Sequence, residues 1–169
     1  CFLIEFNMWT SQFADLYQRQ IIVLEKSLTQ STLSTQLIQN YLSAFYQANS
    51  DFGKLTLRIG QYCDILSRLM IAAKQSSALF ITGCNPHSRL QCAQQNDLAQ
   101  IRLHRELMHY STWIHSGESS DPQNNWPPES SYLALGIDLL QSMQFGIRFK
   151  QNAIIWCNND AIPRLILLR

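Results

Sequence analysis

The chain has 169 residues and a formal net charge of +1, and charged residues make up 15% of it, against ~25% in typical globular domains. This length fits one domain with its own core, and scattered Lys and Arg argue against nucleic acid as a partner, because phosphate binding needs a clustered basic surface. Five cysteines without a C-x-x-C pair argue against a zinc knuckle or a disulfide framework.

Membrane insertion and secretion are also disfavoured by the sequence. The longest apolar runs fall well short of the ~18 residues that a membrane-spanning helix needs. The opening CFLIEF lacks the basic region and the cleavage pattern of a secretory signal, and unpaired cysteines suit a reducing compartment. We therefore expect a cytoplasmic protein without membrane association, with Met8 as a candidate start of the natural chain.

Apolar residues recur at helical spacing from residue 9 to about residue 48: Trp9, Phe13, Leu16, Tyr17, Ile21 and Leu24, then Leu33, Leu37, Tyr41 and Phe45. The spacing predicts two amphipathic helices, separated by TQSTLS at 29–34, whose hydroxyls can cap the second helix. We expect a helical extension at residues 1–40 that packs on a main domain at 41–169. NSDFGK at 49–54 predicts a turn after it.

From residue 55 onward, short strands alternate with helices. Alternating or continuous apolar runs predict strands at 55–59, 78–82, 110–114, 132–137, 152–156 and 164–168. Amphipathic periodicity predicts helices over 62–75, 92–109 and 138–149, and Asp138 with Gln141 has the spacing of a capping box. The polar segment at 115–131 is predicted to be a long loop, which in an ordered domain is often functional.

This order of elements predicts an α+β fold, an α/β sandwich with a mixed β-sheet. Residues 78–157 have the order β-α-β-β-α-β of a ferredoxin-like core. The strands at 55–59 and 164–168 are expected to extend the sheet, and the N-terminal helices to pack on it or to contact a protein partner.

Several motifs resemble a bacterial family, Domain of Unknown Function 3293. They are ITGCNPHSR at 81–89, QQN at 94–96, SGESSDPQNNWPPESSYLALGI at 116–137 and FKQNAIIW at 149–156. With LRIG at 57–60, the resemblance extends over about residues 41–169 and implies no activity. Gly83 stands where the family usually has Ala, and Cys84 where it has an aromatic residue.

The polar turn TGCNPHS, after the predicted strand at 78–82, is the first candidate binding site. Ligands of open α/β sheets bind beyond strand ends, near helix N-termini with unpaired N–H groups. Thr82 and Ser88 offer hydroxyls, Asn85 offers a donor and an acceptor, and Pro86 stiffens the turn. The alternative is a turn with no further role. Asn96 either caps the next helix or bonds back to this turn.

The polar segment at 115–131 is the second candidate. Glu118, Asp121 and Glu129 could present carboxylates to a ligand, with the ring of Trp126 between them. The alternative is a solvated loop in which Trp126 anchors in the core, the interpretation we favour for Trp126 because Trp is highly buried on average. Gln151 and Asn152 either face the same site or satisfy backbone groups at a helix end.

Other chemistry has little support in the sequence. His104 and His109 lie off a common helical face, so a metal site is not expected. Phosphate-loop and dinucleotide fingerprints are absent, so no cofactor is indicated. Cys84 is the thiol expected to be exposed, but without an adjacent base a role as small apolar filler is favoured.

Two hypotheses remain. In the first, the Asn85 turn and the 117–129 loop form one pocket for a small polar metabolite, with catalysis left open because no nucleophile and base can be paired. In the second, the chain is a protein–protein interaction or structural module without a ligand pocket, which predicts dispersed motifs and an exposed apolar patch.

Overall fold

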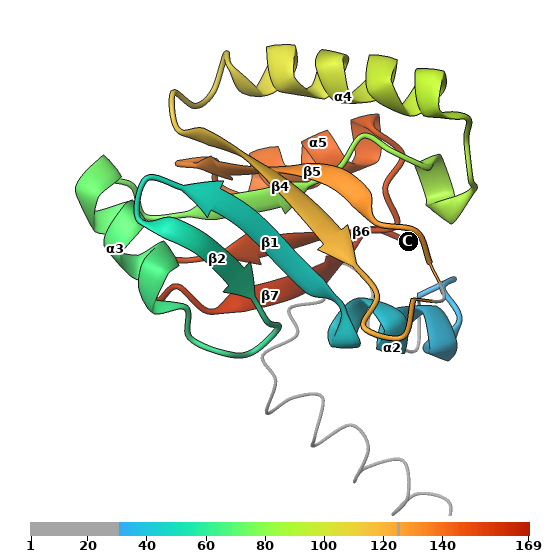
Figure 1. The fold of residues 1–169 in the computed structure, drawn as a ribbon, viewed down its shortest axis with the longest axis horizontal. Helices are drawn as coiled ribbons and strands as arrows, with labels where there is room; N and C mark the ends of the chain where they lie inside the picture. The colour runs from blue at the N-terminus through green and yellow to red at the C-terminus, as the bar shows by residue number, and fades with distance from the viewer. Residues whose placement is uncertain (1–30, 125) are drawn as a thin grey trace, which may run out of the picture.

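The structure is a computed structural model that describes residues 31–124 and 126–169 (Figure 1). The helix expected between residues 9 and 28 lies outside the described residues. In chain order the described elements are α2 (Thr35–Ser43), β1 (Phe45–Ser50), β2 (Gly53–Leu57), α3 (Asp64–Ala73), β3 (Ala78–Ile81), a 3-10 turn (Pro86–Ser88), α4 (Ala93–Leu107), β4 (Ile114–Ser120), β5 (Glu129–Leu135), α5 (Leu139–Arg148), β6 (Ala153–Cys157) and β7 (Pro163–Leu167). The expected α+β class is confirmed.

In the described part of the chain, seven strands form one sheet in the order β2-β1-β4-β5-β3-β6-β7. All neighbouring strands in it are antiparallel, so the expected mixed sheet is wrong. Neighbouring strands are antiparallel because each helical connection skips one strand of the sheet. Helix α4 joins β3 to β4, which are parallel to each other but separated by β5, and α5 joins β5 to β6, which are separated by β3.

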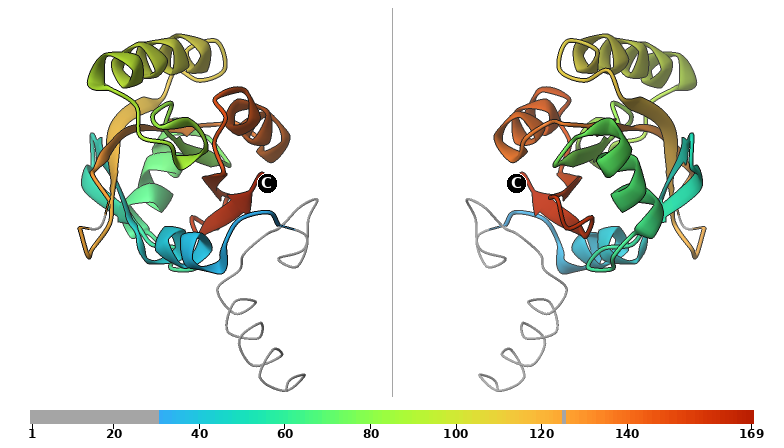
Figure 2. Two further views of the ribbon diagram at one scale, coloured as in Figure 1. Left: turned by 90° about the vertical axis from the view of Figure 1, so that its right-hand side faces the viewer. Right: turned by 90° about the vertical axis from the view of Figure 1, so that its left-hand side faces the viewer.

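The sheet curls until its two edges approach each other. Gly60, just after the edge strand β2, donates its N–H to the carbonyl of Pro163 in the opposite edge strand at 2.9 Å, and Cys63 N–H donates to Ala161 O at 3.1 Å. Figure 2 shows α4 and α5 outside this curl, while α2 and α3 lie at opposite ends of the molecule in Figure 1. Helices α4 and α5 therefore cover the outer face of the middle strands, whereas the outward-facing residues of β2 are exposed.

The core is divided by the sheet into an inner and an outer cluster. In β3, Ala78 and Phe80 belong to the inner cluster with residues of α2 and α3. Leu79 and Ile81 belong to the outer cluster with residues of α4 and α5. All four side chains are buried, as the continuous apolar run of a strand covered on both faces predicts.

Many predicted elements are confirmed within a few residues. Helices α3, α4 and α5 occupy the three predicted helical segments, and β2 and β7 are the two edge strands of the sheet. Ser34 Oγ accepts from Leu37 N at 3.2 Å and caps α2, and Asp138 Oδ1 accepts from Gln141 N at 2.8 Å and caps α5. None of the helices described here is long and apolar enough to cross a membrane.

The prediction of helix up to about residue 48 is wrong. Helix α2 ends at Ser43, and residues 45–50 form β1. Tyr46 and Ala48 point into the inner core while their neighbours are partly exposed, which is the period of a strand. The apolar residues from Leu33 to Phe45 recur every four residues, as in a helix, because β1 begins with Phe45 only one residue after the end of α2.

The prediction of a strand at 110–114 and a loop at 115–131 is also wrong. Residues 108–111 form the turn that ends α4, with Tyr110 N donating to Leu107 O at 2.9 Å. Strand β4 runs from Ile114 to Ser120 and pairs with both β1 and β5. Its Ser, Gly and Glu residues lack an apolar alternation, because hydrogen bonds on both sides rather than apolar burial hold this strand.

Candidate ligand-binding cavity

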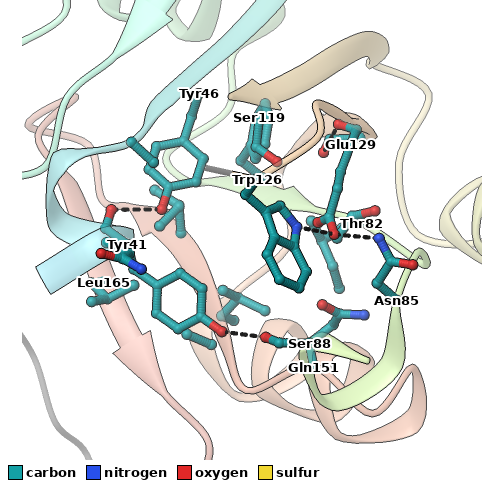
Figure 3. Close-up of a pocket in the computed structure, with 18 of the residues that line it drawn as sticks. Tyr41, Tyr46, Thr82, Asn85, Ser88, Ser119, Trp126, Glu129, Gln151 and Leu165 are labelled. Atoms are coloured by element: carbon teal, nitrogen blue, oxygen red, sulfur yellow. Dashed lines mark hydrogen bonds between the residues drawn. The ribbon is translucent and has the colours of Figure 1, made fainter. Parts of the chain in front are cut away.

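A cavity of about 170 Å³ opens at the end of the curl where β3 and β4 finish and β5 and β6 begin (Figure 3). Helix α2 contributes Tyr41 to its lining, the turn after β3 contributes Asn85 and Ser88, and the connection from β4 to β5 contributes Trp126 and Glu129. Cavities at the mouths of curled or closed sheets are common ligand sites. Two candidate segments therefore meet in one concavity.

Asn85 is the centre of the polar turn and is only 5% exposed. Its Nδ2 donates to Glu129 Oε1 at 2.6 Å, and its Oδ1 accepts from Gln91 N at 2.9 Å and from Asn96 Nδ2 at 3.1 Å. Asn96 Oδ1 in turn accepts from Asn85 N at 2.9 Å. Asn85 therefore joins the turn to the first turn of α4 and to the start of β5, beyond what a simple turn requires.

Glu129, the first residue of β5, is held through one carboxylate oxygen. Its Oε1 accepts from Asn85 Nδ2 and, at 3.1 Å, from the indole Nε1 of Trp126. Its Oε2 accepts no hydrogen bond from the described residues. Pro127 and Pro128 precede it and restrict the backbone. The carboxylate is thus positioned by neutral donors and keeps one oxygen available.

Trp126 is not a core anchor, so the interpretation favoured from the sequence is wrong. It is 37% exposed and lines the cavity, with its ring directed between Tyr46 and Asn85 (Figure 3). The hydrogen bond to Glu129 and the two following prolines hold the indole at the cavity rather than in the apolar clusters.

A second polar group lies across the cavity and comprises Tyr41, Ser88 and Asn152. The Tyr41 and Ser88 hydroxyls are 2.8 Å apart, and Asn152 Nδ2 donates to Ser88 Oγ at 2.9 Å and to Tyr41 Oη at 3.3 Å. The two hydroxyls carry two hydrogens, and their mutual bond uses one. The other hydrogen has no acceptor among the described residues.

Thr82 and Gln151 also line the cavity, and both brace its wall. The Thr82 hydroxyl donates to Ser130 O at 2.7 Å and accepts from Cys84 N at 3.0 Å. Gln151 Nε2 donates to Cys84 O at 3.0 Å and to Phe149 O at 3.2 Å. Gln151 Oε1 accepts nothing from the described residues, so it remains available to a ligand.

Four of the candidate residues lie outside the lining. Glu118 is exposed on β4, and the alternation of the strand directs it away from the cavity that Ser119 lines. Pro86 begins the 3-10 turn. Asn96 and Asn152 lie behind the lining and bond to residues that form it. The expectation that Glu118 would converge with Asn85, Asn96 and Glu129 is therefore wrong.

Cys84 is buried, whereas Cys92 is exposed, so the expectation of an exposed Cys84 is wrong. Burial raises the pKa of the Cys84 thiol, and the nearby charges of Glu129 and Asp97 act in the same direction. A protonated buried thiol fits the role of small apolar filler. Among residues 31–124 and 126–169, no group of three or more His, Cys, Asp or Glu side chains is arranged to hold a metal ion.

Sequence reasoning missed two aromatic members of the cavity, Tyr41 and Tyr46. Both belong to the apolar pattern that predicted a helix up to residue 48, and a tyrosine on an apolar face is usually a core residue. Tyr46 is buried and donates its hydroxyl to Tyr41 O at 2.7 Å. The available signal was two tyrosines near the predicted end of a helix, which alone does not indicate a site.

Comparison with known proteins yields one match. No curated protein and no solved structure matches the chain significantly. A family model matches residues 81–154, the stretch from the end of β3 into β6 that holds Asn85, Asn96, Trp126 and Glu129. The match is shorter than the resemblance expected over about residues 41–169. Over residues 81–154 the chain resembles the family described as Protein of unknown function (DUF3293).

Proposed function

We propose that the cavity binds a small organic molecule with a polar end, which Glu129 recognises. The observation that carries this proposal is the Glu129 carboxylate, which lines the cavity with Oε1 held by Asn85 and Trp126 and with Oε2 unbonded by the described residues. A carboxylate oxygen is a strong acceptor of charge-assisted hydrogen bonds. The positioned oxygen therefore supports recognition of a donor on a ligand.

The opposite side of the cavity supports a second polar contact. The spare hydroxyl hydrogen of the Tyr41 and Ser88 pair is a donor, and Gln151 Oε1 is an acceptor. Between the polar groups, Phe80, Ile155 and Leu165 contribute apolar lining. Ligand sites typically combine an apolar lining with a few placed polar groups, and a cavity of ~150 Å³ accommodates a ring the size of benzene.

An interaction module without a ligand pocket is the second candidate function. Leu98, Ile101 and Met108 are all at least half exposed along α4, which agrees with the apolar patch that this hypothesis predicts. The meeting of the Asn85 turn with Glu129 and Trp126 favours the ligand site, because an interaction module has no need to bring these motifs together.

Two further proposals concern fold type and location. Residues 78–157 are proposed to be a ferredoxin-like unit, which is supported by the strand order β4-β5-β3-β6 and the helix crossovers after β3 and β5. A cytoplasmic location is supported by the free thiols of Cys63, Cys84, Cys92 and Cys157.

A thermal-shift screen of small metabolites tests the binding proposal. A compound present at 100 times its Kd should stabilise the folded chain by about 2.7 kcal/mol. Glu129→Gln keeps an oxygen for Asn85 and Trp126 but removes the charge and the second acceptor, so it should weaken binding of a hit at least tenfold. Glu118→Gln removes the same charge outside the cavity and should leave affinity unchanged. Equal effects of the two variants would refute the proposed site.

A further inference from the structure

The charge of the cavity lining is one-sided. Among the described residues that line it there is no Lys, Arg or His, whereas Glu129 and Asp121 contribute carboxylates. A lining of this kind attracts cations and repels carboxylate or phosphate groups, since a low-dielectric wall strengthens the interaction between charges.

The charge of Glu129 is not neutralised by another side chain. Its two donors among the described residues, the amide of Asn85 and the indole of Trp126, are both neutral, and none of the ion pairs between described residues includes Glu129. Glu129 is partly exposed, and the hydration that its carboxylate loses at the cavity wall is best replaced by a charged partner. A cation next to Oε2 would be such a partner.

Three aromatic rings line the same cavity as this carboxylate, and the ring of Trp126 lies beside it. Trp126, Tyr41 and Tyr46 line the same cavity (Figure 3), and an indole face is the aromatic surface that attracts cations most strongly. Burial raises the pKa of Tyr46, so its ring stays a neutral phenol at physiological pH. The Trp126 Nε1 bond to Glu129 fixes the indole beside the carboxylate, so both groups are placed to contact the same ligand.

We propose that the ligand of this cavity is a small organic cation, with an ammonium or guanidinium group on an apolar body. This inference rests on the proposed function. The cation binds Glu129 Oε2 and the ring of Trp126. The body lies against Phe80 and Leu165, and the hydroxyls of Tyr41 and Ser88 meet an acceptor at its far end where one is present.

Three probes of similar shape and different charge test this proposal: 2-phenylethylammonium, 2-phenylethanol and phenylacetate. Each is titrated into the full chain, and the indole N–H resonances of its four tryptophans are followed by NMR, with Trp126 assigned through Trp126→Phe. We expect the ammonium to bind at least tenfold more tightly than the alcohol, the acetate to bind most weakly, and added salt to weaken the ammonium alone.

The variants separate the cation inference from the binding proposal. Glu129→Gln should lower the affinity of the ammonium by a much larger factor than that of the alcohol, because only the ammonium loses a charge partner, and Glu118→Gln should change neither. Thermal unfolding of both variants checks that each one folds. An ammonium that binds no more tightly than the alcohol overturns the cation inference. The proposed function fails separately if no compound of any charge in the metabolite screen perturbs the Trp126 resonance.

Discussion

The turn between β3 and α4 holds three residues in an unfavourable backbone conformation. Asn85, His87 and Ser88 all have φ between 46° and 57°, in the left-handed region that side chains other than Asn and Gly rarely adopt. Such strain costs on the order of 1–3 kcal/mol per residue. The four hydrogen bonds of Asn85 and the bond from His87 N to Lys150 O at 2.7 Å offset it. Strain of this kind is often found at functional sites.

Gly83 is required by the close approach of α4. A Cβ at this position would lie 2.9 Å from Ala99 O and 3.1 Å from Gln100 Oε1, which accepts from Gly83 N. The backbone of α4 cannot yield as a flexible side chain would. Alanine at this position, usual in the family that residues 81–154 resemble, therefore has no room in this chain.

We expect Gly83→Ala to lower the free energy of unfolding by about 1–3 kcal/mol, the range found when extra atoms enter a packed site. Chemical denaturation of the variant beside the unmodified chain measures the change. Gly83→Ser, with one more atom, should be at least as destabilising. An unchanged midpoint for the alanine variant would mean that α4 is free to shift outward.

At the scale of elements, the side chain of Asp138 caps the N-terminus of α5. Asp138 Oδ1 accepts from Gln141 N at 2.8 Å, and a carboxylate at this end also interacts favourably with the helix dipole. We expect Asp138→Ala to destabilise the fold by about 1 kcal/mol and Asp138→Ser to restore most of the loss. Urea denaturation followed by circular dichroism tests both variants. Equal stability of the alanine and serine variants would show that the cap contributes little.

Element prediction succeeded where burial leaves a simple pattern. The run from Ala78 to Ile81 is buried on both faces and was recognised as a strand, and Asp138 marked the start of α5. It failed for β1 and β4. Strand β1 follows α2 after one residue, so its apolar residues continue the helical spacing of α2. Strand β4 is polar and is held by hydrogen bonds to the strands on both sides of it. Pairing between distant strands is not a local property of sequence.

Prediction of the site was limited by the same long-range pairing. Asn85 and Glu129 were singled out for their chemistry, but they meet because β5 pairs with β3, which places the start of one strand beside the end of the other. The one-residue alternation of β4 directs Glu118 outward and Ser119 inward. Tyr41 joins the site only because α2 covers the end of the curl. The meeting of Asn85 with Glu129, the outward direction of Glu118 and the position of Tyr41 all depend on how the strands pair, and strand order cannot be read from a single sequence.

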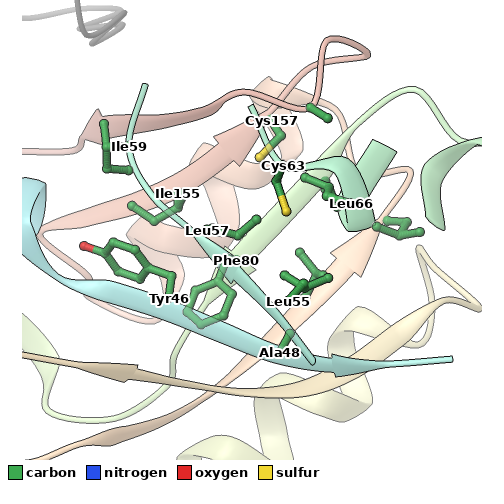
Figure 4. Packing of buried hydrophobic residues seen from close by; sticks show 14 of the residues in the cluster. Tyr46, Ala48, Leu55, Leu57, Ile59, Cys63, Leu66, Phe80, Ile155 and Cys157 are labelled. Carbon is green, nitrogen blue, oxygen red and sulfur yellow. The ribbon is translucent and has the colours of Figure 1, made fainter. Parts of the chain in front are cut away.

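At the scale of the whole molecule, the turn between β6 and β7 closes the curl. Ala161 O and Pro163 O accept from the segment that follows β2. Ile59, Cys63 and Cys157 all belong to the inner cluster, and Figure 4 shows Cys63 beside Cys157. The turn is held by an ion pair in which both terminal nitrogens of Arg164 donate to the Asp160 carboxylate. Arg164 is buried, while about a third of the Asp160 side chain is exposed.

This ion pair should make the stability of the fold depend on pH at the acid end. The hydrogen bond and the charge of Arg164 lower the pKa of Asp160 in the folded state, so the unfolded chain binds a proton more tightly than the folded chain. The pair therefore contributes its full stability above the unfolded pKa of about 4, and the contribution is lost as the pH falls through the lower folded value.

Asp160→Asn tests this assignment. Breaking a buried ion pair costs about 3–5 kcal/mol, but water reaches Asp160, so we expect a loss of about 1–2 kcal/mol at pH 7 after discounting for solvent screening. The difference from the unmodified chain should stay constant from pH 7 to about pH 5 and shrink below about pH 4, where protonation weakens the pair in the unmodified chain as well. A difference as large at pH 3 as at pH 7 would mean that Asp160 stabilises the turn through hydrogen bonds alone, and that the curl is closed without help from charge.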